Sequence, residues 1–425
     1  MFKFIEADSK YKTNTCIYYC ILLFIISVFI KNAPVITNTL VGLIFVFSLI
    51  KTENILSTIF KNKITLGFVL FYFSQFITLL WTEDITAGFD TILSRLPLLI
   101  FPIAFSLIKF ETKTWHRVLL FYSLIVSIAC FLGFSNSIYL AHTLNDAGYL
   151  YNDNISSFLF NFQSVYFSFY VNCAILILFY LLMYTDVLKK TKALVICLIF
   201  YLLFIVFMLA SKTSMFSLAI ILGFITLNYL IKNKKIFESV ILVFGVIVFG
   251  FIIYKISPKT LSRFNGLTQT SFKFDNLNKE NHFNAEFDKS KWSSTNTRVA
   301  IWKCSSEIFK ENPIIGVGIG DVRNSLMSKY SENNFIYGFN TRKNTHNQYI
   351  DIALGMGVLG LLMFLFTFFF MPIKLFLKQK QFLALNIFVC LAICLLTENM
   401  INRYQGIIII SFLLPLVDKL KYKTC

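Results

Sequence analysis

Long apolar runs separated by short polar stretches dominate the chain. Most runs continue for about 15 to 25 residues, the length that crosses ~30 Å of hydrocarbon as an α-helix. They lack the strict apolar and polar alternation of an outer-membrane barrel strand. The pattern predicts an all-α polytopic membrane protein with twelve spans, at residues 15–30, 34–50, 64–81, 92–108, 118–134, 165–184, 193–210, 213–231, 236–254, 347–371, 382–397 and 406–417.

The composition supports a membrane protein. Hydrophobic residues make up 57% of the 425 residues and charged residues only 14%, which excludes a chain of soluble domains. The aromatic share of 17% suits lipid-facing helices and interfacial belts. The nine cysteines lie mainly inside apolar runs and show neither a disulfide framework nor metal-ligand spacing. We therefore expect no metal and no cofactor.

The positive charges are segregated, which explains a net charge of +17 without any nucleic-acid partner. Seven groups of three basic residues fall at alternate ends of the spans, starting with Lys3, Lys10 and Lys12 and ending with Lys419, Lys421 and Lys423. By the positive-inside rule, both termini are cytoplasmic and the segment 255–345 faces outward. The residues after the first span offer no cleavage site for a signal peptidase, so this span is expected to stay in the protein.

The outward connections carry the candidate chemistry. The connection 135–164 contains no Lys or Arg at all, so it also faces outward. ATP is not supplied outside the cytoplasmic membrane. Any transfer reaction there must use a bond that is already activated in its substrate.

A helix is predicted in the outward segment from Ser293 onward, with Thr295 as its N-cap. Arg298 falls in the first turn, where the helix dipole disfavours a cation, so its position indicates an anionic partner. An ordinary solvated arginine is the alternative. The pair Asn312-Pro313 ends the helix, whose apolar face is formed by Val299, Trp302, Ile308 and Phe309.

Three glycines follow this helix, at positions 316, 318 and 320. A dinucleotide-binding loop is excluded because no strand-helix-strand unit surrounds them and their spacing is wrong. Gly316 and Gly318 predict a tight turn, and their backbone amides are weak candidates for a phosphate contact. Asp321 is expected to cap a short helix that contains Arg323.

His346 opens the tenth span, at the N-terminal end of a predicted helix. The positive end of the helix dipole favours the neutral imidazole, which is the form a general base requires. The alternative is a histidine that only caps the helix or anchors it at the interface. Gly355, Gly357 and Gly360 in the same span are small residues that permit close helix packing.

Two more polar clusters lie at the predicted outer ends of spans. Lys212 occupies a very short turn between two apolar runs, and the connection 398–405 supplies Glu398, Arg403 and Gln405. Charges this close to hydrocarbon are candidates for function. The alternative for Lys212 is a side chain that simply extends into the lipid headgroups.

The motifs together resemble the O-antigen ligase and O-antigen polymerase superfamily of bacterial membrane glycosyltransferases. The resemblance rests on His346 and Asn347, followed after nine residues by Gly357-x-x-Gly360, and on the preceding Arg298-x-x-x-Trp302 and Asn312-Pro313-x-x-Gly316-x-Gly318. Weaker similarity covers 80–84, 95–102 and 398–406, so it extends over nearly the whole chain.

This resemblance implies an inverting, metal-independent transfer of a glycan from a polyprenyl diphosphate to an acceptor hydroxyl, at the outer face of the bacterial cytoplasmic membrane. It implies that Arg298 binds the diphosphate and that His346 activates the acceptor or otherwise serves the reacting centre. The family's second arginine aligns with Lys212, which keeps the charge but loses the two-pronged grip of an arginine. Either diphosphate binding is looser, or other arginines such as Arg403 share the task. Supporting positions are Asn347, Glu398, Gln405, Gly316, Gly318, Gly357 and Gly360.

Several functions stay open at this point. The favoured one is a polymerase that joins lipid-linked repeat units, because 398–405 looks similar to polymerase-type members. A ligase that attaches glycan to lipid A core and an enzyme that glycosylates protein are alternatives. A flippase or transporter is a distant one, because few ionisable residues lie at mid-membrane and the long connection is neither central nor cytoplasmic.

The expected partners are a polyprenyl-diphosphate-linked oligosaccharide, an acceptor glycolipid or lipid-linked glycan, and the bilayer. The expected organisation is an N-terminal bundle of nine helices (1–254), an outer loop with short helices (255–345) and C-terminal spans (346–425). The region most similar to O-antigen ligases is 193–372. A free-standing outer domain is disfavoured because the scattered Phe264, Phe272, Phe274, Phe283 and Phe287 make a poor autonomous core.

Overall fold

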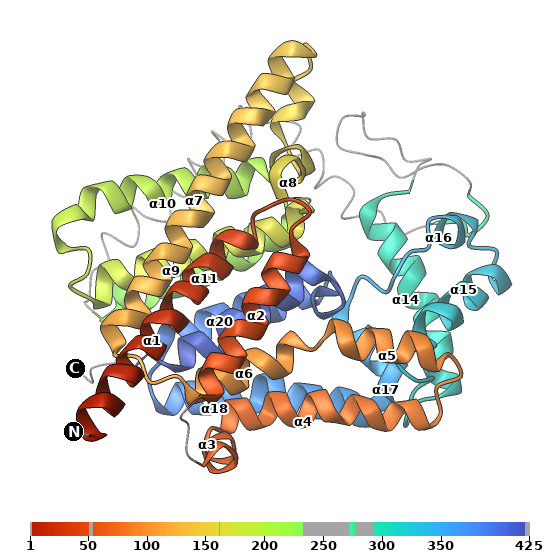
Figure 1. Cartoon of the computed structure of the whole chain (residues 1–425). Helices are drawn as coiled ribbons and strands as arrows, with labels where there is room; N and C mark the ends of the chain where they lie inside the picture. The colour runs from red at the N-terminus through yellow and green to blue at the C-terminus, as the bar shows by residue number, and fades with distance from the viewer. Residues whose placement is uncertain (1, 51–53, 161, 233–271, 277–291, 421–425) are drawn as a thin grey trace.

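The computed structural model describes residues 2–50, 54–160, 162–232, 272–276 and 292–420, and these residues form an all-α fold (Figure 1). Its helices are α1 (Phe2–Ser27), α2 (Pro34–Leu49), α3 (Ile55–Lys61), α4 (Lys63–Ile77), α5 (Ile85–Ser94), α6 (Pro97–Leu107), α7 (Thr112–Thr143), α8 (Asp153–Phe160), α9 (Ser164–Tyr184), α10 (Lys192–Met208), α11 (Lys212–Lys232), α14 (Ser294–Glu311), α15 (Val322–Glu332), α16 (Ile336–Asn340), α17 (Gln348–Leu365), α18 (Met371–Lys378), α19 (Phe382–Leu395) and α20 (Tyr404–Asp418).

Six helical stretches in the described part of the chain are long and apolar enough to cross a membrane: Lys63–Leu80, Ile85–Leu107, Thr112–Thr143, Ser164–Tyr184, Lys189–Met208 and Gln348–Lys378. Five shorter apolar helices accompany them: Thr13–Ser27, Pro34–Leu49, Lys212–Thr226, Phe382–Leu395 and Tyr404–Asp418. Each coincides with one of the expected spans. The remaining expected span, 236–254, lies outside the described residues.

Helix boundaries differ from the sequence prediction where proline and glycine interrupt long runs. The stretch expected at 92–108 begins earlier, as α5, and is interrupted after Ser94, before Pro97 starts α6. The span expected at 347–371 continues through a π-helical turn into α18, so its helical path ends at Lys378.

The core of the bundle is built from aromatic side chains on helices far apart in the sequence. Phe24 of α1 packs against Phe101 of α6 with ring centroids 5.0 Å apart, and Phe412 of α20 lies 5.6 Å from Phe101. α9 is buried along most of its length and forms the centre of the bundle, whereas less than a third of α10 is buried. Apolar helices in contact with each other thus hold the two ends of the chain together.

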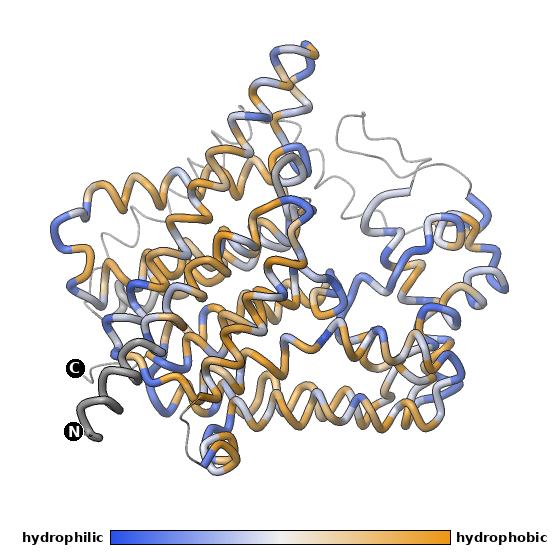
Figure 2. The backbone as a smooth tube through the Cα atoms, viewed as in Figure 1, coloured by the Kyte–Doolittle hydropathy of each residue, from blue (hydrophilic) through white to orange (hydrophobic). Residues whose placement is uncertain are grey.

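Polar contacts gather at two opposite ends of the bundle. At one end, Asn62 before α4 donates to the Asp418 carboxylate at 2.9 Å, and Lys419 donates to the carbonyl of Ser106 at 3.3 Å. At the other end, the hydroxyls of Thr213 and Thr397 are 2.8 Å apart. Each of these three contacts joins residues that the sequence prediction placed on the same side of the membrane. Figure 2 shows hydrophilic residues at the helix ends.

The helices α14, α15 and α16 form a separate lobe beside the bundle (Figure 1). Its small core contains Trp292, Tyr330 and Phe335, and it is joined to the bundle through Leu354 of α17. Phe272 and Phe274 pack against this core, while Phe264, Phe283 and Phe287 lie outside the described residues. The lobe packs on α17, as expected, but it has more of a core of its own than the sequence indicates.

Candidate active site

α14 carries Arg298 toward the bundle. The helix begins one residue after Ser293, whose hydroxyl accepts from the amide of Asn296, while the Asn296 side chain accepts from the amide of Ser293. This capping box makes Ser293 the N-cap of α14. The predicted N-cap, Thr295, lies two residues later, so that prediction is wrong. Arg298 consequently lies in the second turn, beyond the strongest part of the helix dipole.

Glu398 joins Arg298 to His346. One carboxylate oxygen, Oε1, accepts from Nη2 of Arg298 at 3.1 Å, and the other, Oε2, lies 3.5 Å from Nδ1 of His346. The carboxylate is nearly buried, with 8% of the side chain exposed, whereas the arginine and histidine side chains are 24% and 26% exposed. One buried anion therefore holds two partly exposed groups at the edge of the site.

The charge state of Glu398 follows from this geometry. Glu398 lies between α19 and α20, outside the spans. Burial is the largest single influence and raises the pKa of its carboxyl, but His346 and Arg298 together outweigh it and hold the pKa below its ordinary value. The carboxylate is therefore ionised at neutral pH.

Arg298 keeps donors for another anion. Its Nη1 donates to the carbonyl of Ser294 at 3.3 Å, one turn back along α14. Its Nε is buried and has no hydrogen-bond partner among the described residues. Because an unpaired buried donor is unfavourable, this N–H suits an oxygen of a bound anion.

The sequence predicted His346 in the first turn of its helix, but the residue lies just before the helix begins. It has a left-handed backbone conformation, with φ +45°, and its amide donates to the Asn344 side chain at 3.1 Å. Asn347 is the N-cap of α17 and accepts from the amides of Tyr349 and Ile350. The cap therefore belongs to Asn347, which leaves the His346 side chain available to face Glu398.

Asn399 ties the histidine segment to the Glu398 segment. Its side-chain oxygen accepts from the amide of Asn347 at 2.7 Å and from the hydroxyl of Thr345 at 3.0 Å. Its side-chain nitrogen donates to Asp351 at 2.8 Å. The residues on both sides of His346 are thus fixed by the residue that follows Glu398.

A buried ion pair lies beneath this contact. Arg95, between α5 and α6, approaches Asp351 of α17 at 3.8 Å, and their side chains are only 3% and 8% exposed. Asn402 donates to the same Asp351 oxygen, Oδ2, at 2.6 Å, and Arg95 donates to Gln75 at 2.5 Å. The sequence prediction did not include Asp351 or Asn399 in the site. An acidic residue inside an apolar span was the available signal for Asp351.

The glycine motifs join two segments of backbone. Gly357 has φ +64° and breaks α17, which leaves nearby carbonyls and amides without helical partners. The amides of Val317 and Gly318 donate to the carbonyls of Leu354 and Gly355, at 2.8 and 3.1 Å, and the amide of Val358 donates to the carbonyl of Pro313 at 2.8 Å. These pairs replace the missing helical bonds.

The glycine pairing corrects two predictions. The amides of Val317 and Gly318 are used by α17, so the loop has a structural role where a phosphate contact was considered. A side chain on Gly316 or Gly357 would collide with the facing backbone, at Leu354 and Ile314 respectively. Gly360 is different, because its neighbour is the Met356 side chain of its own helix. Position 357 therefore requires a glycine because α17 is broken there, and not because two helices pack closely.

Asp321 has a different role from the one expected. It stands at the N-cap position of α15, but its carboxylate accepts from the amides of Glu83 and Asp84, at 2.7 and 2.9 Å, and caps nothing in its own helix. The glycine loop is thereby attached to the turn before α5. Arg323 is exposed on α15 and takes no part in the cluster around Glu398.

The remaining predicted residues border the same end of the bundle. Lys212 is the first residue of α11, and the hydroxyl of the next residue, Thr213, contacts Thr397 immediately before Glu398. Arg403, the N-cap of α20, is exposed and interacts with the Tyr166 hydroxyl, which also lies near Glu398.

Gln405 contributes through its backbone. Its carbonyl accepts from the Tyr170 hydroxyl at 2.7 Å. The structure therefore brings Arg298, His346 and Glu398 together directly, with Lys212 and Arg403 on neighbouring segments. Among the described residues, no three His, Cys, Asp or Glu side chains are grouped so as to hold a metal ion.

Comparison with known families gives this geometry a context. Residues 197–365 match the family model described as O-antigen ligase. This match supports the resemblance of the chain to the O-antigen ligase and polymerase superfamily. A search of curated proteins finds no match. The O-antigen ligase segment contains Lys212, Arg298, the glycine loop and His346, whereas Glu398 and Arg95 lie outside it.

The O-antigen ligase family points to a glycosyltransferase-type membrane enzyme with lipid-linked glycan substrates. The contacts of Glu398 connect Arg298 and His346 of the matched segment to a residue that lies beyond it. The cluster combines one histidine with Arg298 and, on adjoining segments, two further cations. Such a set is able to accept a proton and to stabilise a phosphate leaving group.

Proposed function

We propose that the protein transfers a glycan from a polyprenyl-diphosphate donor to an acceptor sugar, as a polysaccharide polymerase. The observation that carries this proposal is the Glu398 carboxylate shared between Arg298, at 3.1 Å, and His346, at 3.5 Å. It links a cation suited to a diphosphate with a base suited to a hydroxyl. These are the two requirements for displacing a diphosphate from a sugar.

His346 acts as the general base in the proposed reaction. With Nδ1 facing the Glu398 carboxylate, the tautomer that carries its proton on Nδ1 leaves the Nε2 lone pair for the acceptor hydroxyl. As the acceptor oxygen forms its bond to the anomeric carbon, the hydroxyl proton passes to Nε2. The Glu398 carboxylate then stabilises the imidazolium, as an acidic partner does in hydrolase triads.

Arg298 receives the leaving group. The bond between the anomeric carbon and the diphosphate oxygen breaks, and the electron pair leaves with the diphosphate. The unpaired Nε–H of Arg298 meets the developing charge, with Lys212 and Arg403 nearby. Attack opposite the leaving group inverts the anomeric centre. We propose that cationic side chains, and not a metal ion, neutralise the diphosphate.

The proposed orientation follows from the charges. The cluster around Glu398 belongs to the end of the bundle opposite Asn62, Ser106 and Lys419. Since basic residues concentrate at that second end, we place it in the cytoplasm and the site at the outer face of the cytoplasmic membrane of a bacterium. Twelve spans and cytoplasmic termini are part of this proposal.

The choice of polymerase rests on the 398–405 connection, which resembles polymerase-type members and supplies Glu398, Arg403 and Gln405. The test is to supply the protein, reconstituted in lipid vesicles, with one polyprenyl-diphosphate repeat unit as both donor and acceptor. The polymerase predicts a ladder of products spaced by one repeat on a gel. No ladder, followed by transfer once lipid A core is added, would identify a ligase instead.

A further inference from the structure

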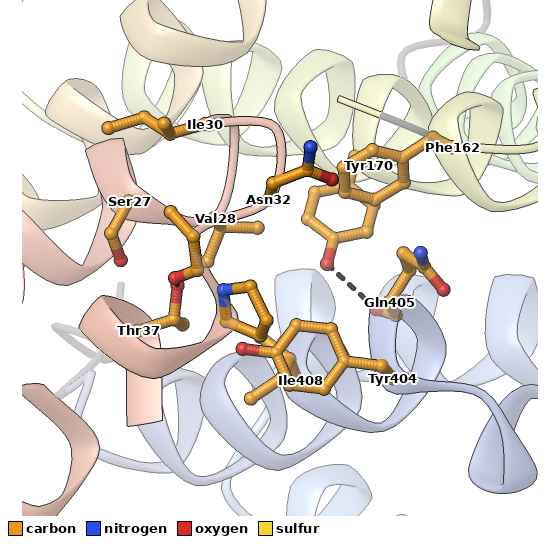
Figure 3. A pocket seen from close by; sticks show the side chains of 12 residues that line it. Ser27, Val28, Ile30, Asn32, Thr37, Phe162, Tyr170, Tyr404, Gln405 and Ile408 are labelled. Atoms are coloured by element: carbon orange, nitrogen blue, oxygen red, sulfur yellow. Dashed lines mark hydrogen bonds between the residues drawn. The ribbon is translucent and has the colours of Figure 1, made fainter. Parts of the chain in front are cut away.

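A cavity of about 300 Å³ lies beside the candidate active site. It is enclosed by the turn between α1 and α2, the start of α9 and the start of α20 (Figure 3). Asn32 lines it from the turn between α1 and α2, and Thr37 lines it from the start of α2. Tyr404 and Gln405 line it from the start of α20. The volume is at the lower end of the roughly 300–1,000 Å³ typical of ligand pockets.

The cavity adjoins the reacting groups through two segments. On α9, Tyr166 interacts with Arg403, and one turn later Tyr170 lines the cavity and donates to the carbonyl of Gln405. On α20, Arg403 is followed directly by the two lining residues Tyr404 and Gln405. A ligand in the cavity would therefore be a direct neighbour of the Arg403 side of the site.

The lining is polar but uncharged. Amides from Asn32 and Gln405 and a hydroxyl from Thr37 accompany the rings of Phe162, Tyr170 and Tyr404. Among the described residues, no Lys, Arg, Asp or Glu lines the cavity. None of these lining residues supplies a counter-ion for a diphosphate or a charged headgroup. Neutral donors and acceptors beside aromatic rings suit a ligand with hydroxyl groups on one side and C–H groups on another, as in a pyranose ring.

The space next to the cavity is too small for a long lipid chain. Between Phe24, Tyr122 and Phe412, only about 10 Å³ of free space remains. Tyr170 and Ile408 separate the two spaces, since they line both. That volume holds about one water molecule at most, so an isoprenoid tail has no path through it.

We propose that this cavity binds one sugar residue of the lipid-linked glycan substrate. The proposal rests on the proposed transfer reaction, because it places the sugar residue next to the Arg403 segment of the site. The same pyranose chemistry has two sources, the glycan of the donor and the glycan of the acceptor. Both sources use the same neutral contacts, and only kinetics separates them.

The first experiment measures sugar binding without turnover. The probe is the free oligosaccharide repeat released from its lipid by mild acid, titrated into the full-length protein in lipid nanodiscs and followed by saturation-transfer NMR. Loss of the ring in Tyr404→Ala should weaken binding about tenfold, whereas Tyr404→Trp should restore most of it. Asn32→Gly removes an amide while keeping a residue that tolerates φ +60°.

The second experiment assigns the source. A labelled polyprenyl-diphosphate donor is paired with an alkyl glycoside of the repeat, which lacks a diphosphate and serves only as acceptor. In Tyr404→Ala, a KM raised about tenfold for one substrate, with kcat within about twofold, identifies that substrate as the occupant. Tyr139→Ala, at an exposed tyrosine on α7 that does not line the cavity, should leave both KM values unchanged.

Other outcomes overturn the proposal. Unchanged oligosaccharide affinity and unchanged KM values in folded Tyr404→Ala and Asn32→Gly would do so. A co-purified phospholipid that is lost in Tyr404→Ala, with sugar binding intact, would assign the cavity to lipid. Binding is also measured in His346→Ala. If the wild type binds sugar but never transfers it, the proposed function fails while the cavity assignment stands.

Discussion

The Glu398 carboxylate lies 3.5 Å from Nδ1 of His346, although 52 positions separate the two residues in the chain. This contact depends on Asn399, which holds the amide of Asn347 on the far side of the histidine. The base and its acidic partner are thus positioned by the same short connection before α20. In the proposed reaction, the contact selects the tautomer of His346 and stabilises its protonated form.

Replacing Glu398 tests this pairing. Glu398→Gln keeps the shape but removes the charge, so we expect kcat to fall about 10²-fold, within the range for impaired general-base catalysis. KM for the donor should change less, since Arg298 stays in place. Initial rates of transfer with labelled donor give both constants. Glu332→Gln, an exposed carboxylate on α15, is the matched control. Equal losses in the two variants would remove the proposed role of Glu398.

The lowered pKa of Glu398 predicts a pH dependence of stability. Since the folded-state pKa is below the ordinary value of 4.5, its contribution is fully present above about pH 4.5 and is lost as pH falls below that value. Thermal unfolding of detergent-solubilised wild type and Glu398→Gln should therefore show a constant difference from pH 7 to 5 and a shrinking one below 4.5. A difference that shrinks between pH 7 and 6 would contradict the assignment.

The Arg95–Asp351 pair should behave as a buried ion pair. Arg95→Met leaves Asp351 buried without its cation, at an expected cost of about 3–5 kcal/mol in unfolding free energy. The double variant Arg95→Met with Asp351→Leu should recover much of that loss, because no unpaired charge remains. Denaturation in a double-mutant cycle measures the coupling. Additive losses would show that the 3.8 Å contact carries no coupling energy.

The glycine pairing predicts a sharp difference between similar substitutions. Gly357→Ala introduces a side chain where φ is +64° and where the Ile314 backbone faces it, so we expect a loss of at least about 1 kcal/mol and of activity. Gly42→Ala adds a side chain with nothing within 4 Å and should be neutral or mildly stabilising. Thermal unfolding compares the two. Matching effects would mean that the break in α17 has no structural importance.

Hydropathy predicted the positions of the apolar helices well, because a chain in hydrocarbon must satisfy its backbone hydrogen bonds within helices. Six of these helical stretches in the described residues are long and apolar enough to cross a membrane. Eleven apolar helices in the described ranges coincide with expected spans. The break at Gly357 was missed because a glycine in an apolar run also suits close helix packing. Whether such a glycine has a positive φ depends on the backbone that faces it, here residues 313–318.

The site was predictable in its residue types but not in its contacts. Arg298, His346 and Glu398 were each identified from position and motif. The sequence did not show that one carboxylate connects the other two, since such contacts form only when α14 and the connection before α20 meet. Asp351 was missed for the same reason, because its partner Arg95 lies 256 positions away.

The most direct test of the proposed function follows both products of one reaction. Purified protein in lipid vesicles receives a polyprenyl-diphosphate repeat unit, and glycosidic bond formation and release of free polyprenyl diphosphate are measured together. The account predicts equal amounts of both products in the wild type and a loss of both by about 10²- to 10⁴-fold in folded His346→Ala. Transfer at the wild-type rate in His346→Ala would contradict the account.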